Sequence, residues 1–238
     1  MSRTLAISDI HGCYDTFIRL LKRASYQPGQ DTLILLGDYV DRGHSSKAVM
    51  ELIMELVSYP RVVALRGNHD HRFWELMTGA DFSVKDRFIQ HGGWETMKSY
   101  CGLETNAIFD EDSFASCREA IGRRFQNHLT FISKLPLYHE DDAHIYVHAG
   151  LNPSYMDWKE QPERDFMWIR EPFIHHKTKV SKKVVFGHSR TVDIHGSGDV
   201  WFGNDKIGID GACSYGYQLN CLEIIDESYY VYSEPFDH

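Results

Sequence analysis

The stretch Thr32–Gly43, TLILLGDYVDRG, decides the expected fold. It opens with the aliphatic run Leu33–Leu36, which is long enough to form a buried strand. The run stops at Gly37, and two carboxylates follow three residues apart, Asp38 and Asp41. In open α/β sheets, ligands bind at the carboxyl ends of the strands, so this strand would present acidic side chains at a binding edge. Asp and Gly are also ordinary turn residues, and for the stretch taken alone a turn explains the pattern equally well.

The flanking sequence places this strand in an α/β domain. Apolar runs at residues 3–8 and 61–65 read as two further strands, and amphipathic helices are predicted between them at residues 14–24 and 46–57. This alternation predicts parallel strands joined by right-handed crossovers. Residues 71–135 lack strand-like runs and are predicted to form a helical insert near the active site. Strands return at residues 143–147 and 183–186, and the short alternating pieces after residue 200 indicate a second, mostly antiparallel sheet.

Composition limits the functional class. A chain of 238 residues with 42% hydrophobic residues can bury a substantial core, and a single domain over residues 1–238 is the simplest prediction. The net charge of −9 argues against stable nucleic-acid binding and against an anionic membrane surface, because both favour a basic face. The five cysteines form no C-x-x-C pair, no secretory signal is recognised, and no apolar stretch reaches the length of a membrane span. These features favour a cytoplasmic protein with free thiols; the oligomeric state stays open, with a monomer as the default expectation.

Five strand-like runs each end in side chains of the kinds that bind metal ions. In order, these are Asp9 and His11; Asp38 and Asp41; Asn68, His69 and Asp70; His148; and His188. Turn chemistry explains Asp, Asn and Gly at strand ends but gives histidine no special advantage. The repeated pattern therefore predicts a metal site where the strand ends meet.

The ligand types indicate which metals would bind. A ligand set of carboxylate, imidazole and amide oxygen groups without thiolates favours Mn²⁺, and Fe, Zn²⁺, Ni²⁺ and Co²⁺ are the alternative ions. Six such groups are too many for one ion that must also bind water, but enough for two ions that share a carboxylate. We predict Asp38 as the shared ligand, with Asp9 and His11 completing one ion; Asn68, His148 and His188 would complete the other. A hydroxide bridging both ions would be the nucleophile at neutral pH.

As an ordered set, these motifs resemble those of the calcineurin-like metallophosphoesterases. The segments that carry the resemblance are Asp9–Gly12 (DIHG), Gly37–Gly43 (GDYVDRG), Gly67–Asp70 (GNHD), His148–Gly150 (HAG) and Gly187–His188 (GH). The VDRG ending is similar to the phosphoprotein phosphatase branch, which includes small bacterial and phage-type serine/threonine phosphatases and the bacterial diadenosine tetraphosphate hydrolases. The resemblance implies a four-layer α/β/β/α sandwich of two mixed sheets flanked by helices.

The resemblance also implies roles for residues outside the metal site. His69 matches the family's general acid, and Asp41 matches the acid that orients it. Arg42 matches a phosphate clamp, and Arg170 resembles the second phosphate arginine of the small bacterial phosphatases; a surface arginine is the alternative for Arg170. Although His91-Gly92-Gly93 also fits a His-Gly-Gly motif, it follows a helix-like segment, so we predict a helix start or a pocket wall there.

The expected reaction is hydrolysis of phosphomonoesters by direct attack of the metal-bridging hydroxide, and the first candidate is a serine/threonine protein phosphatase. The alternative is a bis(5'-nucleosyl)-tetraphosphate hydrolase, which could also remove RNA caps. The substrate would therefore be a phosphorylated protein or a nucleotide. A third possibility, a metal-bound scaffold without catalysis, is disfavoured because His69, Asp41 and Arg42 are all present. His44 and His71, which lie beside the motifs, are possible substrate contacts.

Overall fold

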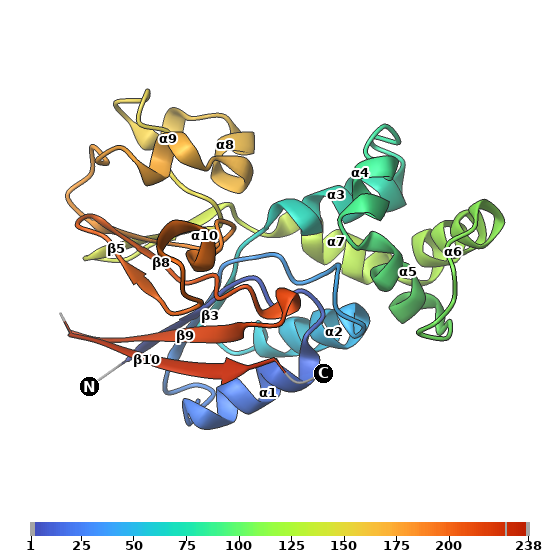
Figure 1. Ribbon diagram of the computed structural model, residues 1–238, viewed down its shortest axis with the longest axis horizontal. Helices are drawn as coiled ribbons and strands as arrows, with labels where there is room; N and C mark the ends of the chain where they lie inside the picture. Colours follow the sequence, from blue (N-terminus) through green and yellow to red (C-terminus); the bar gives the residue numbers. More distant parts are fainter. Residues whose placement is uncertain (1–2, 227, 237–238) are drawn as a thin grey trace.

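The computed structural model describes residues 3–226 and 228–236 and contains two five-stranded sheets (Figure 1). The first sheet has the order β10-β9-β1-β2-β3 and the second β4-β5-β6-β8-β7. The strands of the first sheet are β1 (Thr4–Ile7), β2 (Thr32–Leu35), β3 (Val62–Ala64), β9 (Gln218–Ile225) and β10 (Ser228–Pro235). Those of the second are β4 (Tyr138–Glu140), β5 (His144–Val147), β6 (Lys183–Phe186), β7 (Trp201–Phe202) and β8 (Lys206–Gly208).

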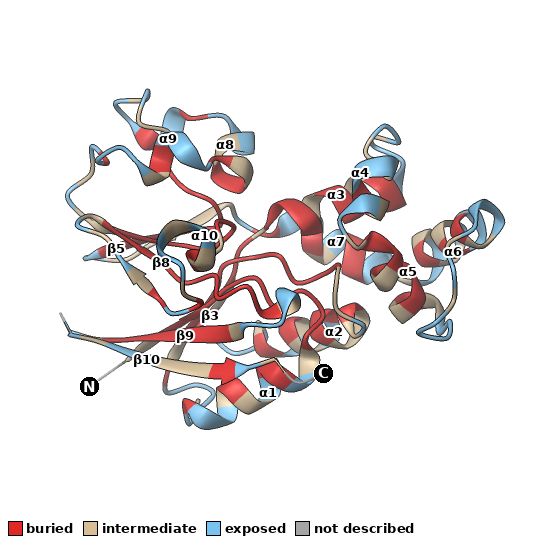
Figure 2. Ribbon diagram, in the orientation of Figure 1, coloured by how far each residue is buried: buried red, intermediate tan, exposed pale blue. Residues whose placement is uncertain are grey.

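Strand β2 shows how the layers form. Leu33 and Leu35 belong to the core between the first sheet and its helices, whereas Ile34 and Leu36 belong to the core that includes Tyr146 and Val185 of the second sheet. Successive side chains of a strand point to opposite faces, so a continuous aliphatic run fills both cores at once. Figure 2 shows the strands near the centre of the molecule as largely buried. This arrangement confirms the predicted sandwich of two mixed sheets.

Helices cover the outer face of each sheet. Helices α1 (Tyr14–Arg23) and α2 (Ser46–Leu56) pack on the first sheet. The short helices α8 (Glu163–Trp168) and α9 (Glu171–Ile174) contribute Phe166 and Phe173 to the core outside the second sheet. Helix α10 (Thr191–His195) and the 3₁₀ turns Trp158–Glu160 and Cys213–Tyr215 complete the connections.

The C-terminal strands correct the expectation of a separate, mostly antiparallel second sheet. Strands β9 and β10 extend the first sheet, with β9 antiparallel to β1. In the second sheet, β5, β6 and β8 are parallel, and only the edge strands β4 and β7 are antiparallel. The alternating pattern predicted the strands but carries no information about their partners. The near-complete burial of β9 on both faces marks it as a central strand.

The segment between β3 and β4 is helical, as predicted. It contains α3 (Asn68–Thr78), α4 (Lys85–Gln90), α5 (Gly93–Cys101), α6 (Glu111–Arg124) and α7 (Gln126–Lys134). Figure 1 shows these helices grouped to one side of the sheets. Within the ranges given above, no helix has both the length and the apolar character to cross a bilayer. All five cysteines are free thiols.

An ion-pair network ties β1 to the start of β2 and to β9. The Arg3 guanidinium lies 2.9 Å from Asp31 and 2.6 Å from Glu223. Burial alone would raise the pKa of Asp31, but hydrogen bonds from Arg3 and from the Gln27 amide outweigh burial and hold the pKa below its ordinary value. The carboxylate of Asp31 therefore stabilises the fold when it is ionised.

We expect Asp31→Asn to lower the free energy of unfolding at neutral pH by about 1–3 kcal/mol, the range for charge-assisted hydrogen bonds. Because the folded-state pKa of Asp31 is depressed, its contribution is complete above the unfolded-state pKa and disappears as the pH falls through the folded-state pKa. Urea unfolding of wild type and variant should therefore differ at pH ~7, and the difference should shrink as the pH falls below the ordinary carboxyl pKa of ~4. An equal difference at neutral and at acidic pH would contradict this assignment.

Candidate metal centre and active site

The strand ends of both sheets converge at one place. Asp9 and His11 follow β1, Asp38 and Asp41 follow β2, and Asn68 and His69 begin α3 after β3; from the second sheet, His148 follows β5 and His188 follows β6. The His188 amide donates to Asp9 Oδ2 at 2.9 Å, and the Gly187 amide donates to the His148 carbonyl at 2.8 Å. All the residues predicted from the motifs lie in this one region.

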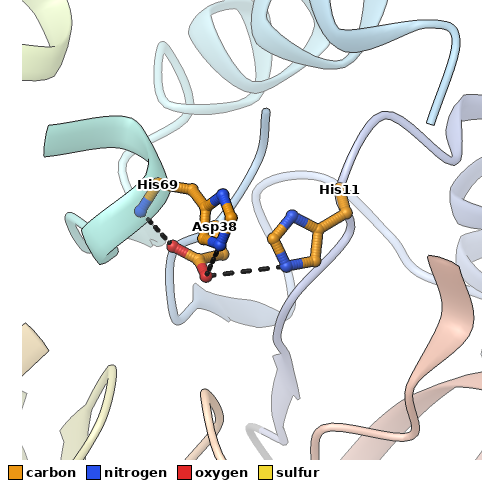
Figure 3. A group of neighbouring side chains, drawn as sticks. All are labelled: His11, Asp38 and His69. Atoms are coloured by element: carbon orange, nitrogen blue, oxygen red, sulfur yellow. Dashed lines mark hydrogen bonds and ion pairs between the residues drawn. The ribbon is translucent and has the colours of Figure 1, made fainter. Parts of the chain in front are cut away.

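Asp38 lies between two groups of potential metal ligands. His11 Nε2 is 3.6 Å from Asp38 Oδ2 and 3.8 Å from Asp9 Oδ1. On the other side, His148 Nε2 is 3.4 Å from Asp38 Oδ1 and 3.0 Å from Asn68 Oδ1. The groups His11–Asp38–His69 and Asp38–His148–His188 each place three donor atoms within 4.8 Å of one another. Figure 3 shows His11 and His69 on either side of Asp38 in the first group.

The donor atoms fit divalent metal ions. His11 Nδ1 donates to the Val40 carbonyl at 2.7 Å, and His148 Nδ1 donates to the Leu36 carbonyl at 2.8 Å, which leaves Nε2 of each ring facing Asp38. Asp9 and Asp38 are only 3% and 2% exposed, so two carboxylates share a nearly closed space and need positive charge beside them. No cysteine belongs to either group, which favours ions that prefer oxygen and nitrogen.

The backbone of the loops is unusual at these positions. Positive φ angles occur at Asp9 (54°), His11 (46°), Asp38 (58°), Asp41 (72°), Arg42 (70°) and His188 (62°). Left-handed conformations are costly for residues with a β-carbon and persist only where the surrounding structure enforces them. The loops are therefore shaped to aim these side chains inward.

Asp70 and Ser8 hold the loops in place. Asp70 accepts hydrogen bonds from the amides of Asp38 (2.8 Å), Gly67 (3.0 Å) and Tyr39 (2.9 Å). Burial and the neighbouring Asp38 raise the pKa of Asp70 to about 7. Ser8 donates to Asp9 Oδ2 at 2.5 Å, and a β-carbon on Gly187 would overlap both of these side chains.

His69 and Asp41 form a pair below the pocket. His69 Nδ1 lies 2.6 Å from Asp41 Oδ2, and Thr96 Oγ1 donates to Asp41 Oδ1 at 2.8 Å. Burial raises the pKa of Asp41 well above its usual range and lowers the pKa of His69 well below its usual range. Burial thus disfavours the charged form of both groups. Thr96 belongs to α5, and the helical insert therefore helps to orient this pair.

Arg42 contacts both histidines of the first group. Its Nη1 lies 2.6 Å from His11 Nε2 and its Nη2 lies 3.1 Å from His69 Nε2. A guanidinium can only donate, so both ring nitrogens act as acceptors here. His11 Nε2 cannot accept from Arg42 and bind a metal ion at the same time. A metal ion bound at His11 Nε2 would replace this contact with Arg42.

A cavity of about 260 Å³ opens above these residues and is lined by four arginines: Arg42, Arg72, Arg170 and Arg190. Arg170 Nε donates to His188 Nε2 at 3.1 Å, which places the predicted second phosphate arginine in the pocket. Arg190 is held by Asp193 at 2.8 Å, and the Tyr215 ring lies 4.4 Å from its guanidinium carbon. The same ring lies 4.8 Å from the guanidinium carbon of Arg42.

Sequence reasoning missed Arg72 and Arg190. Arg72 follows His69 by three residues on a helix, so its position on the same face could have been foreseen. His91, at the start of the segment His91-Gly92-Gly93, contacts Arg72 at 3.1 Å, and Gly93 begins α5, as predicted for this segment. Gly92 (φ 91°) is needed here because a β-carbon would overlap the Arg42 backbone. Nothing in the spacing of Arg190 indicated its place in the pocket.

Known proteins are similar to this chain over most of its length. The family model for calcineurin-like phosphoesterases matches residues 2–209. A symmetrical bis(5'-nucleosyl)-tetraphosphatase of Shigella dysenteriae is 43% identical, with 96% of this chain and 93% of that protein covered. Serine/threonine-protein phosphatase 1 of Salmonella typhimurium is 24% identical, with 92% and 90% covered.

A solved structure supports the fold. The cold-active protein-tyrosine phosphatase of a Shewanella species superposes with a TM-score of 0.65 at 16% identity, and the match covers 99% of this chain and 80% of that one. Together with the family match, this places the arrangement of the two sheets among known phosphoesterases. The chain therefore belongs to the calcineurin-like phosphoesterase family and is a phosphoric ester hydrolase of that family.

Proposed function

We propose that this enzyme hydrolyses phosphoanhydrides of nucleotides, with a bis(5'-nucleosyl) polyphosphate as its substrate class. The observation that carries the proposal is the set of four arginines around one small cavity. A planar guanidinium can grip two phosphate oxygens, so two arginines suffice for a single phosphoryl group. Arg72 and Arg190 add two further cationic groups, which suit a substrate with several adjacent phosphates. The relatives named bis(5'-nucleosyl)-tetraphosphatases are consistent with this choice.

The second candidate is the serine/threonine protein phosphatase. Arg42 follows Asp41 in the VDRG segment, and Arg170 approaches the same cavity from the second sheet, so these two alone form a clamp for a phosphomonoester. The similarity to a bacterial serine/threonine phosphatase also supports this reading. The two additional arginines are the feature that favours the nucleotide substrate over it.

The proposed metal site binds two divalent ions, Mn²⁺ first, with Asp38 as the shared ligand, Asp9 and His11 on one side, and Asn68, His148 and His188 on the other. When bound, two such ions would neutralise phosphate charge and lower the pKa of a water molecule that serves as the nucleophile. Asn68 supplies a neutral amide oxygen, which lies 3.0 Å from His148 Nε2, and the rings of His148 and His188 supply neutral nitrogens. The negative charge of this ligand set therefore comes from Asp9 and Asp38.

The protein residues supply binding and proton transfer. A phosphate in the cavity competes for the N–H groups that Arg42 now donates to His11 and His69. Once Arg42 turns to the phosphate, His69 Nε2 is free to carry a proton and donate it to the leaving oxygen, while Asp41 keeps Nδ1 in position. Arg170 and Arg190, which line the same cavity, hold further phosphate oxygens.

Competing substrates test the proposal directly. The Mn²⁺-loaded protein should hydrolyse diadenosine tetraphosphate with a kcat/KM at least about tenfold above that for a phosphothreonine peptide at equal concentration, because only the former uses all four arginines. Chromatography of the nucleotide products shows whether cleavage is symmetrical. A tenfold preference for the peptide would establish the phosphatase alternative, and turnover of neither by metal-loaded protein would contradict both.

A further inference from the structure

A second cavity adjoins the metal centre. It also measures about 260 Å³, lies between helices α3 and α4 on one side and α8 on the other, and shares Arg72 and Trp168 with the arginine-lined cavity. The shared residues make the two cavities neighbours.

The direction of helix α3 shows which part of a substrate would enter. His69, the proposed general acid, lies in the first turn of α3, and Arg72 lies three residues later on the same face. A leaving group that takes its proton from His69 therefore lies next to Arg72. Besides Arg72, the second cavity is lined by His71 and Glu75 of the same helix. The leaving group of the substrate is therefore the part that would extend into the second cavity.

His71 offers an unused polar atom at this cavity. Its ring stacks on Trp74 with centroids 5.8 Å apart and meets Trp168 edge-on at 5.7 Å. His71 Nε2 lies 3.3 Å from Glu75 Oε1, whereas Nδ1 is buried without a hydrogen-bond partner in the described part of the chain. A buried polar atom without a partner is costly. Because Nδ1 has almost no exposed surface, a ligand in the cavity reaches it only when the His71 ring turns toward the cavity.

The charges around the second cavity are mixed. The lining contains three arginines, Arg72, Arg87 and Arg164, and three carboxylates, Glu75, Asp81 and Glu163. A free phosphate would meet these carboxylates unfavourably. A nucleoside suits the cavity better, because its base and ribose carry hydrogen-bond donors for carboxylates and acceptors for guanidinium groups, and its flat base can pack against Trp168.

We propose that this second cavity binds the nucleoside of the leaving nucleotide and that His71 Nδ1 hydrogen-bonds to it, while Arg72 holds the intervening phosphate. The inference rests on the proposed nucleotide substrate. It adds a binding site and a specificity-determining residue that lie outside the metal ligands and the phosphate clamp.

The test compares His71→Phe with wild type. Phenylalanine keeps a flat ring between Trp74 and Trp168 but lacks the ring nitrogens. His139→Phe is the matched control, because His139 is likewise a half-buried ring beside an aromatic residue, with its centroid 5.9 Å from that of Tyr146, and lies on β4 away from both cavities. Binding of ADP and of pyrophosphate is measured by calorimetry on metal-free protein, so this readout does not depend on turnover.

We expect His71→Phe to raise the Kd for ADP by about fivefold, the effect of one lost hydrogen bond, and to leave the Kd for pyrophosphate within about twofold. In steady-state assays the KM for diadenosine tetraphosphate should rise, while turnover of p-nitrophenyl phosphate, which has no nucleoside, stays at the wild-type rate. His139→Phe should change none of these values.

Three results would overturn the inference: an unchanged Kd for ADP, equal losses for ADP and pyrophosphate, or an effect confined to a phosphothreonine peptide, which would make the cavity a peptide site. Failure of the proposed function looks different. Wild-type protein would then hydrolyse no dinucleoside polyphosphate, yet the dependence of ADP binding on His71 would still be measurable.

Discussion

Replacing His69 with asparagine should lower kcat by about 10²–10⁴-fold, the usual contribution of a general acid, while the bound metal content stays at the wild-type level. Asparagine has no titratable nitrogen, so it cannot deliver a proton to the leaving oxygen. The expected loss depends on the leaving group: it should be large for phenyl phosphate and much smaller for p-nitrophenyl phosphate, whose phenolate departs without protonation. Parallel rate and metal measurements on both substrates check this.

The metal content decides between two roles for His69. Its ring nitrogens also fall within reach of Asp38 and His11, with Nε2 4.0 Å from Asp38 Oδ2, so the geometry alone would allow His69 to bind a metal ion. Loss of a metal ion in His69→Asn, or equal losses of rate for the two phenyl esters, would show that His69 is a ligand and not the acid. The 2.6 Å contact with Asp41 is the observation that favours the acid role.

Replacing Asp38 with asparagine should abolish hydrolysis and lower the bound metal from two ions to fewer than one per chain. Asp38 places Oδ2 toward His11 and Oδ1 toward His148, so it is the one carboxylate between both ligand groups. Asparagine keeps the shape but removes the negative charge and one of the two oxygen donors. Elemental analysis after Mn²⁺ loading and gel filtration gives the metal content.

Asp9→Asn is the matched control for Asp38→Asn. Asp9 Oδ1 lies 3.8 Å from His11 Nε2, on the side of the first ligand group, so the loss of this carboxylate should weaken one ion more than the other. Both variants should stay folded, because Asp9 and Asp38 lie in loops outside the strands. Two ions retained by Asp38→Asn, or identical losses in the two variants, would contradict the assignment of Asp38 as the shared ligand.

The sequence predicted the positions of the ligand groups because strand ends carry their side chains to a common edge. The aliphatic run Leu33–Leu36 and the short runs at residues 3–8 and 143–147 correspond to the strands β2, β1 and β5. The predicted layers were also confirmed. Local pattern sufficed for these features, because each depends on one strand and the few residues that follow it.

Features that depend on distant contacts were not predictable from local pattern. The pairing of β9 with β1 and the hydrogen bond from Thr96 to Asp41 join residues far apart in the sequence. The place of Arg190 in the arginine-lined cavity likewise depends on residues far away in the sequence, such as Arg42 and Arg72. Periodicity reports which face of an element is apolar but not which element will cover it.

The most direct test of the central claim is a Mn²⁺ titration of the metal-free protein, with bound metal and hydrolysis of p-nitrophenyl phosphate measured on the same samples. The strand-end geometry, with Asp38 between two ligand groups, predicts saturation at two ions per chain and hydrolysis that rises with occupancy of the second site. Saturation at one ion, or hydrolysis that persists in excess chelator, would contradict the proposed two-metal site.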